Sequence, residues 1–263
     1  MNLVLVPGIF GFERLGQLQY FNGVAAHLEK TFPDVHAAAM NTDPFGTVPD
    51  RAEVLAAEIV RAFGSTEDVH IIAHSMGGLD ARFLVSLDLA NMRERVRTIV
   101  TVGTPHSGSP VATAIEKVNS LDSLTDLLRL HGSFIDELRS KVNAVKDLSE
   151  AGAAALNKRC IDVPQIRYFE IAGVGRDQLF HTAKLYVPTF LFVYSAAGLN
   201  DGVVAVASAR RQRPLFASWA GDHSDLIGHD LDGPTPFSPP QFNYLLGYED
   251  IIRRCILGQS RHV

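Results

Sequence analysis

The sequence predicts an α/β fold in which a mostly parallel central sheet has helices on both faces. Short apolar runs rich in β-branched residues alternate along the chain with longer segments whose apolar residues recur at helical spacing. Such alternation places a crossover helix between neighbouring parallel strands. The composition, with 46% hydrophobic and 20% charged residues, is that of a globular protein and excludes disordered, collagen-like and coiled-coil chains.

Residues 1–89 contribute two strands and three helices to this pattern. A buried strand is predicted at Leu3–Val6, where an apolar run ends at a Pro-Gly pair. Apolar residues at helical spacing predict helices over Tyr20–Phe32 and Ala52–Phe63. A second buried strand, Val69–Ala73, leads into a third helix, Gly77–Leu89.

The rest of the chain contributes three more strands and a closing helix. Val96–Val102 is rich in β-branched residues, and Ile166–Ile171 and Leu215–Trp219 are predicted to follow it in the sheet. We expect irregular structure between the last two of these strands. Helical spacing then predicts a closing helix over Phe242–Ile256.

The region from 108 to 162 interrupts the alternation, because it contains helical patterns with no strand between them. A helical excursion of about 50 residues exceeds the length of an ordinary loop. We therefore expect a core formed by residues 1–107 and 163–263, with residues 108–162 inserted as a helical lid over a site. A helix pair that only packs on the core is the alternative.

The net charge and the cysteine content limit the possible partners and cellular locations of the protein. The formal net charge of −5 argues against a nucleic-acid partner, which would need a basic face. Cys160 and Cys255 are too few for a disulfide scaffold, and no paired-cysteine zinc pattern, leader peptide or transmembrane segment is evident. We expect reduced thiols and a cytoplasmic protein, with a secreted mature form as the alternative.

The strongest functional signal is the turn Ala73-His74-Ser75-Met76-Gly77. A predicted strand precedes it and a predicted helix follows, which is the arrangement of a nucleophile elbow that exposes a serine Oγ above the sheet. Gly77 supplies the small side chain that such a tight turn requires. The N-terminal amides of the following helix favour negative charge at this place. Ser75 is therefore the candidate nucleophile.

A serine nucleophile needs a general base, and the base needs an orienting carboxylate. With this elbow the expected order along the chain is serine, acid, histidine. His223 follows the predicted last strand, at the edge of the sheet where Ser75 lies, and is the candidate base. Asp201 lies in an Asn-Asp-Gly turn and is the candidate acid. The alternatives are His229, His106 and His181 for the base, and Asp177 and Asp222 for the acid.

Acyl transfer develops negative charge on an oxygen atom, and two preorganised N–H donors are needed to stabilise it. The backbone N–H of Met76, directly after Ser75, is one candidate donor. The other is expected in the loop after the first strand, where Gly8 lets the backbone approach the site. We expect Ile9 to supply this donor, with Phe10 as the alternative.

Taken together, these motifs resemble those of bacterial true lipases, the family I triacylglycerol lipases of the α/β-hydrolase superfamily. The resemblance covers most of the chain and is thin through the predicted lid. It rests on five segments in the same order, namely residues 3–12, 73–78, 102–109, 200–202 and 222–225. It implies an ester hydrolase with an α/β-hydrolase fold, a Ser75–Asp201–His223 triad and oxyanion donors at Ile9 and Met76.

The same resemblance implies a mobile helical lid within residues 108–162 and raises the question of calcium. The family's calcium site uses an aspartate two residues after the catalytic histidine, and Asp225 has that position. Only Asp177 offers a second acidic ligand, and His229 stands where the family has a carbonyl oxygen, although hard cations prefer oxygen ligands. We expect no required cofactor, with calcium at Asp225 as the alternative.

We therefore expect a serine hydrolase of carboxylic esters, most simply a triacylglycerol lipase or esterase that meets its acyl ester in solution or at a lipid–water interface. The alternatives are hydrolysis of a phospholipid, thioester or polyester, transfer of the acyl group to another alcohol, and a catalytically silent binding module with this fold. The apolar stretch Leu185–Leu199 is shorter than the ~20 residues that span a bilayer. It suits either the wall of an acyl site or the core.

Overall fold

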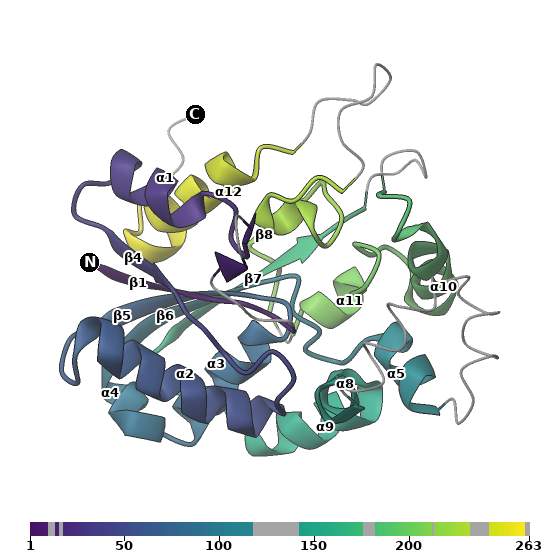
Figure 1. The fold of residues 1–263 in the computed structure, drawn as a ribbon, viewed down its shortest axis with the longest axis horizontal. Helices are drawn as coiled ribbons and strands as arrows, with labels where there is room; N and C mark the ends of the chain where they lie inside the picture. The colour runs from purple at the N-terminus through teal and green to yellow at the C-terminus, as the bar shows by residue number, and fades with distance from the viewer. Residues whose placement is uncertain are drawn as a thin grey trace.

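A six-stranded sheet with all neighbouring strands parallel organises the computed structural model (Figure 1). The structure describes residues 1–9, 14–15, 18–117, 142–175, 182–211, 213–231 and 242–260. The strands are ordered β4-β1-β5-β6-β7-β8 across the sheet. Their bounds are β1 (Asn2–Val6), β4 (His36–Ala39), β5 (Val69–His74), β6 (Val96–Val102), β7 (Arg167–Gly173) and β8 (Ala217–Trp219). A separate antiparallel ribbon pairs β2 (Arg14–Leu15) with β3 (Leu18–Gln19).

Strands β1, β5 and β6 form the centre of the sheet and are buried on both faces. Successive side chains of a strand point to opposite faces, so a doubly covered strand must be apolar at every position. In β1, Val4 and Val6 join one core cluster, and Leu3 and Leu5 join the other. This burial explains why the central strands could be recognised as runs of mostly apolar or β-branched residues.

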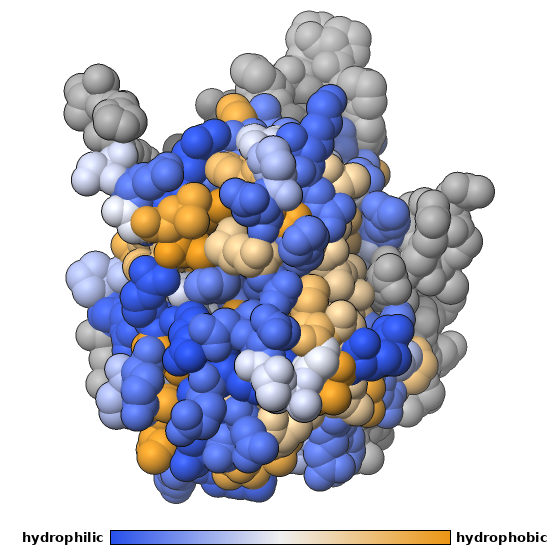
Figure 2. Space-filling model, turned by 90° about the vertical axis from the view of Figure 1, so that its left-hand side faces the viewer, coloured by the Kyte–Doolittle hydropathy of each residue, from blue (hydrophilic) through white to orange (hydrophobic). Residues whose placement is uncertain are grey.

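Helices cover both faces of the sheet, as predicted (Figure 1). One face is covered by α1 (Val24–Thr31), α12 (Tyr244–Asp250) and a π-helical continuation, η4 (Ile251–Ile256). The other is covered by α2 (Val48–Phe63), α3 (Gly77–Ser86) and α9 (Glu150–Arg159). The side of the molecule that faces the viewer in Figure 2 is mostly hydrophilic, with smaller apolar areas between.

The remaining short helices lie beside the carboxyl ends of the strands or connect the strands at their other end. At the carboxyl ends are α5 (Pro110–Lys117), α8 (Val142–Leu148), α10 (Val187–Ala197), α11 (Val206–Ala209) and η3 (Asp225–Ile227). The connection before β6 contains η1 (Leu89–Asn91) and α4 (Met92–Arg95). Loops at the carboxyl edge of a parallel sheet are where ligand sites of α/β proteins form.

Three features differ from the sequence-based expectation. The strand β4 was not expected, because its sequence His-Ala-Ala-Ala lacks β-branched residues. The expected irregular stretch before the last strand contains the helix α10, whose sequence is apolar on every side and therefore has no helical periodicity. The first helix starts at Val24 and not at residue 20, because Gly23 has a positive φ of 68°. Helical patterns expected between 118 and 141 lie outside the described residues.

Candidate active site

Ser75 occupies a strained turn between β5 and α3. Its φ is +54°, a backbone conformation that few residues other than glycine adopt. The Ser75 N–H donates to the Val102 carbonyl oxygen at 2.9 Å, which fixes the turn to the neighbouring strand. A Cβ atom on Gly77 would lie 2.6 Å from the carbonyl oxygens of Val6 and Pro7, so only glycine fits there. This is the geometry of the predicted nucleophile elbow.

The structure brings Ser75, His223 and Asp201 into one chain of hydrogen bonds. Ser75 Oγ lies 3.0 Å from His223 Nε2, and His223 Nδ1 lies 2.7 Å from Asp201 Oδ2. Ser75 is 5% exposed and Asp201 is fully buried. Asp201 follows β7 and α10, and His223 follows β8, so the three side chains converge at one edge of the sheet from distant parts of the sequence.

The Asp201 carboxylate is held by backbone donors of its own turn. Its Oδ1 accepts the N–H groups of Val203 at 3.0 Å and Val204 at 2.7 Å, which leaves Oδ2 for the histidine. In addition, the His223 N–H donates to the Asp201 carbonyl oxygen at 2.8 Å. The loop that carries Asp201 and the loop that carries His223 are therefore held together by a backbone hydrogen bond as well as by the bond to the imidazole.

Two backbone N–H groups beside Ser75 have no hydrogen-bond partner within the described part of the chain, namely those of Ile9 and Met76. Met76 is buried at the start of α3, and Ile9 lines the same cavity as Ser75. Unpaired donors are rare in a protein interior. The structure thus places both predicted oxyanion donors at the site, whereas Phe10, the alternative to Ile9, lies outside the described residues.

Arg51 fixes the direction in which the Ile9 N–H points. Its guanidinium is fully buried and donates to the carbonyl oxygens of Pro7 at 2.8 Å and Gly8 at 3.0 Å. Because a trans peptide bond directs its C=O and N–H to opposite sides, holding the Gly8 carbonyl toward Arg51 turns the Ile9 N–H away from it. The buried carboxylate of Asp80 balances the charge of Arg51 at 2.8 Å.

Burial raises the pKa of Asp80 to about 6, and the positive charge of Arg51 opposes this shift. Arg51 was not singled out from the sequence. A signal was nevertheless present, because it lies on the buried face of α2, three residues after Val48 and four before Leu55. A charged residue at such a position needs a buried partner.

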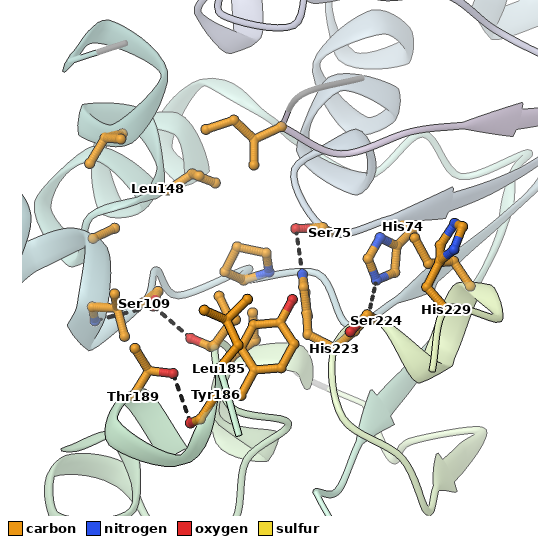
Figure 3. Close-up of a pocket in the computed structure, with 18 of the residues that line it drawn as sticks. His74, Ser75, Ser109, Leu148, Leu185, Tyr186, Thr189, His223, Ser224 and His229 are labelled. Carbon is orange, nitrogen blue, oxygen red and sulfur yellow. Dashed lines mark hydrogen bonds between the residues drawn. The ribbon is translucent and has the colours of Figure 1, made fainter. Parts of the chain in front are cut away.

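A cavity of about 420 Å³ opens above Ser75 (Figure 3). This volume is within the range of roughly 300–1,000 Å³ that small-molecule sites have. In Figure 3, Ser75 and His223 point toward each other at one side, and Leu148 lies across the space. Most of the wall is apolar, and part of it comes from α5 and α8, through Val111, Ala112, Ile115, Val145 and Leu148.

Parts of the predicted lid and of the apolar stretch 185–199 therefore line the cavity. Leu185 and Thr189 line it, whereas Phe190 and Val193 are buried in the packing of α10. Each of the two expected roles of that stretch thus applies to some of its residues. That residues 108–162 move as a lid stays a prediction.

The competing candidates lie elsewhere or serve other contacts. His229 donates to the carbonyl oxygens of Gln19 and Tyr20, and buried His106 is 3.0 Å from Thr101 Oγ1. Asp222 accepts the backbone N–H groups of Ala183, Ser224 and Asp225, and so shapes the loop that carries His223. Asp177 and His181 lie outside the described residues.

Asp225, the calcium candidate, helps to hold its loop, and whether the site binds calcium stays a prediction. Its Oδ2 accepts the Asp222 N–H at 2.9 Å, so one carboxylate oxygen is already used to hold the loop. Within the described ranges, no group of three or more His, Cys, Asp or Glu side chains is placed to hold a metal ion. The same part of the chain contains no helix long and apolar enough to cross a membrane.

Comparison with known proteins finds a matching family and relatives that are named triacylglycerol lipases. Residues 46–191 match the family described as the PGAP1-like alpha/beta domain. A triacylglycerol lipase of Pseudarthrobacter phenanthrenivorans is 26% identical over 182 residues, covering 66% of this chain and 55% of that protein. A triacylglycerol lipase of Pseudomonas fragi is 24% identical over 268 residues, covering 88% of this chain and 89% of that one.

The fold has counterparts among solved structures. Lipase 1 from Pelosinus fermentans superposes with a TM-score of 0.70 at 19% identity, covering 99% of both chains. This likeness confirms the predicted α/β-hydrolase fold. The chain spans about half the length of the first curated relative it matches.

Proposed function

Because the chain belongs to the PGAP1-like alpha/beta domain family and has the α/β-hydrolase fold, we propose that it is a serine hydrolase of carboxylic esters. The observation that carries this proposal is the continuous hydrogen-bond chain from Ser75 through His223 to Asp201, at one side of an apolar cavity. The names of the curated relatives support triacylglycerols as the substrate class.

In the proposed reaction, Ser75 Oγ attacks the ester carbonyl carbon while His223 Nε2 takes its proton. The carbonyl oxygen becomes negative and accepts hydrogen bonds from the N–H groups of Ile9 and Met76. Asp201 holds the imidazole with its proton on Nδ1 and stabilises the imidazolium that forms. His223 then protonates the leaving alcohol as the C–O bond breaks.

Water completes the cycle. His223 removes a proton from a water molecule as that water attacks the acyl carbon, and it returns the proton to Ser75 Oγ when the carboxylic acid leaves. The apolar walls from α5 and α8 suit the acyl chain, because burial of each methylene is worth about 0.8 kcal/mol.

We further propose that the substrate is met at a lipid–water interface. Leu191 and Tyr194 of α10 are 50% and 55% exposed, and Leu199 just beyond it is 52% exposed. No charged residue occurs between Lys184 and Asp201. Turnover that rises sharply once the ester exceeds its solubility limit would support this proposal, and a rate that follows dissolved ester alone would contradict it.

A cytoplasmic location is supported by the two cysteines. Cys160 and Cys255 are buried and not bonded to each other, as is usual in a reducing compartment. Cell fractionation tests this proposal, and recovery of the protein outside the cytoplasm would contradict it.

Hydrolysis of p-nitrophenyl esters from acetyl to palmitoyl tests the function. We expect Ser75→Ala to remove turnover with little change in thermal stability, and the same change at exposed Ser195 on α10 to leave turnover intact. A maximum at long chains supports a lipase, and one at short chains an esterase. Parallel assays with a chelator test whether turnover depends on calcium. If Ser75 reacts with a fluorophosphonate but no ester is hydrolysed, the acyl substrate is of another kind; no reaction at Ser75 would contradict the proposal.

A further inference from the structure

Tyr20 and His74 connect the loop that carries one oxyanion donor with the loop that carries the base. The Gly8 N–H donates to Tyr20 Oη at 2.8 Å, and Tyr20 Oη lies 2.9 Å from His74 Nδ1. On the other side of its ring, His74 Nε2 lies 3.1 Å from the His223 carbonyl oxygen. His74 and Tyr20 are 1% and 8% exposed, and both line the cavity.

The direction of each hydrogen bond follows from the chemistry of the groups. A carbonyl oxygen can only accept, so the proton of a neutral His74 is on Nε2 and is donated to His223. Nδ1 is then an acceptor and receives the Tyr20 O–H. The remaining lone pairs of Tyr20 Oη accept the Gly8 N–H. Each of these three hydrogen bonds therefore has one donor and one acceptor.

The environment keeps both side chains neutral. Burial holds the pKa of the His74 imidazole well below its usual value, and the nearby His223 ring lowers it further. The two ring centroids are 4.5 Å apart, so a positive charge on His223 during catalysis opposes protonation of His74. Burial also raises the pKa of Tyr20. His74 thus stays a hydrogen-bond acceptor toward Tyr20 while His223 carries the proton.

We propose that Tyr20 and His74 are positioning residues that hold the Gly8–Ile9 segment and the His223 loop in one fixed arrangement, a role that rests on the ester hydrolysis proposed above. Arg51 holds the carbonyl side of the Pro7–Gly8 peptide, and Tyr20 holds its N–H side. With both edges held, the peptide plane cannot rotate.

Rotation of that plane would move the next peptide as well and turn the Ile9 N–H away from the developing oxyanion. Displacement by about 1 Å can cost about 100-fold in rate. Space for compensation is small, because a Cβ atom on Gly8 would lie 2.7 Å from both Tyr20 Oη and Ser75 Cβ. The role therefore concerns the turnover step more than the binding of substrate.

Tyr20→Phe tests the hydrogen bond between the Gly8 N–H and Tyr20, because it removes only the hydroxyl. We expect kcat to fall about 10- to 100-fold, below the loss of roughly 100- to 1,000-fold for complete removal of an oxyanion donor. KM should change less than about threefold. Tyr168→Phe is a matched control, because Tyr168 is 8% exposed and its Oη accepts the Val163 N–H at 3.0 Å, away from the cavity.

Variants of His74 test the hydrogen bond between Tyr20 and His74. In His74→Asn the amide oxygen occupies the place of Nδ1 and still accepts from Tyr20, whereas His74→Phe accepts nothing. We expect kcat to fall in His74→Phe and to recover at least fivefold in His74→Asn. In a double variant with Tyr20→Phe, the loss should be smaller than the product of the single losses, because both act through one hydrogen bond.

Three results would overturn the positioning role: a Tyr20→Phe variant with kcat within twofold of wild type, losses confined to KM, or independent effects in the double variant. The reaction of Ser75 with a fluorophosphonate separates this failure from failure of the proposed function. If Ser75 of the wild type does not react, the proposed ester hydrolysis is contradicted. If Ser75 of the wild type reacts and Tyr20→Phe reacts at the same saturating rate constant, only the positioning role is contradicted.

Discussion

Asp201→Asn is the sharpest test of how the candidate acid works, because the structure fixes which way the new amide must face. Asp201 Oδ1 accepts two backbone N–H groups, from Val203 and Val204. If the amide nitrogen faced these donors, two buried N–H groups would lose their acceptor, at about 1–3 kcal/mol each. The amide oxygen therefore stays there, and the NH2 group faces His223 Nδ1.

An amide donor at that place reverses the tautomer of the base. His223 Nδ1 must then accept, so its proton moves to Nε2, which can no longer accept the proton of Ser75 Oγ. A wrong tautomer of this kind costs about 10⁴-fold in kcat, or about 5 kcal/mol of transition-state stabilisation. The protein should still fold, because Asn has nearly the same shape and keeps the two backbone hydrogen bonds.

The assay is kcat for the best p-nitrophenyl ester, with thermal unfolding measured in parallel. Asp88→Asn is the matched control, since Asp88 lies after α3 and has a positive φ of 57°, which Asn tolerates well. We expect wild-type rates for that variant. If Asp201→Asn keeps kcat within tenfold of wild type, the tautomer argument fails and another group orients His223.

Three further variants probe the scaffold. Arg51→Met leaves the Asp80 carboxylate buried without a counter-charge, so the free energy of unfolding at pH 8 should fall by about 3–5 kcal/mol in urea titrations; a loss under 1 kcal/mol would contradict this. Burial lowers the pKa of His70 to about 4, so between pH 6.5 and 4 the unfolded chain binds a proton that the folded protein does not. The melting temperature of His70→Val should therefore rise relative to wild type as pH falls through this window, and a difference independent of pH would refute the assignment. Gly77→Ala places a Cβ atom 2.6 Å from two backbone carbonyl oxygens, so fluorophosphonate labelling and about 2 kcal/mol or more of stability should be lost; normal labelling would show that the turn can widen.

The fold could be predicted where a single physical rule decides the local sequence. Strands β1, β5 and β6 are covered on both faces, so most of their residues are apolar and the strands stand out. The edge strand β4 consists of one histidine and three alanines, whose pairing with β1 depends on the rest of the sheet. The helix α10 is apolar on all sides because parts of it face the core and the cavity while others are exposed, which leaves no periodicity to read.

Some residues of the candidate site could likewise be predicted from the sequence, and others could not. Ser75 is marked by its own turn, and the order of elements in the fold indicates Asp201 and His223, which the structure places within hydrogen-bond distance. Tyr20 and Arg51 have no such local signal. Their importance comes from contacts with the backbone of Gly8, which is 12 residues from Tyr20 and 43 from Arg51, and only the folded structure specifies those contacts.

The sequence separation within the site has a consequence for biosynthesis. Ser75 and His223 are 148 residues apart, and His223 follows β8, the last strand to be added to the sheet. At ~5–20 residues per second, a growing chain carries the nucleophile for on the order of ten seconds before its base exists. Under the proposed function, nascent and prematurely released chains should therefore be inert toward esters. Hydrolysis should begin only when the final strand has docked, so the appearance of activity in a translation reaction should mark completed folding.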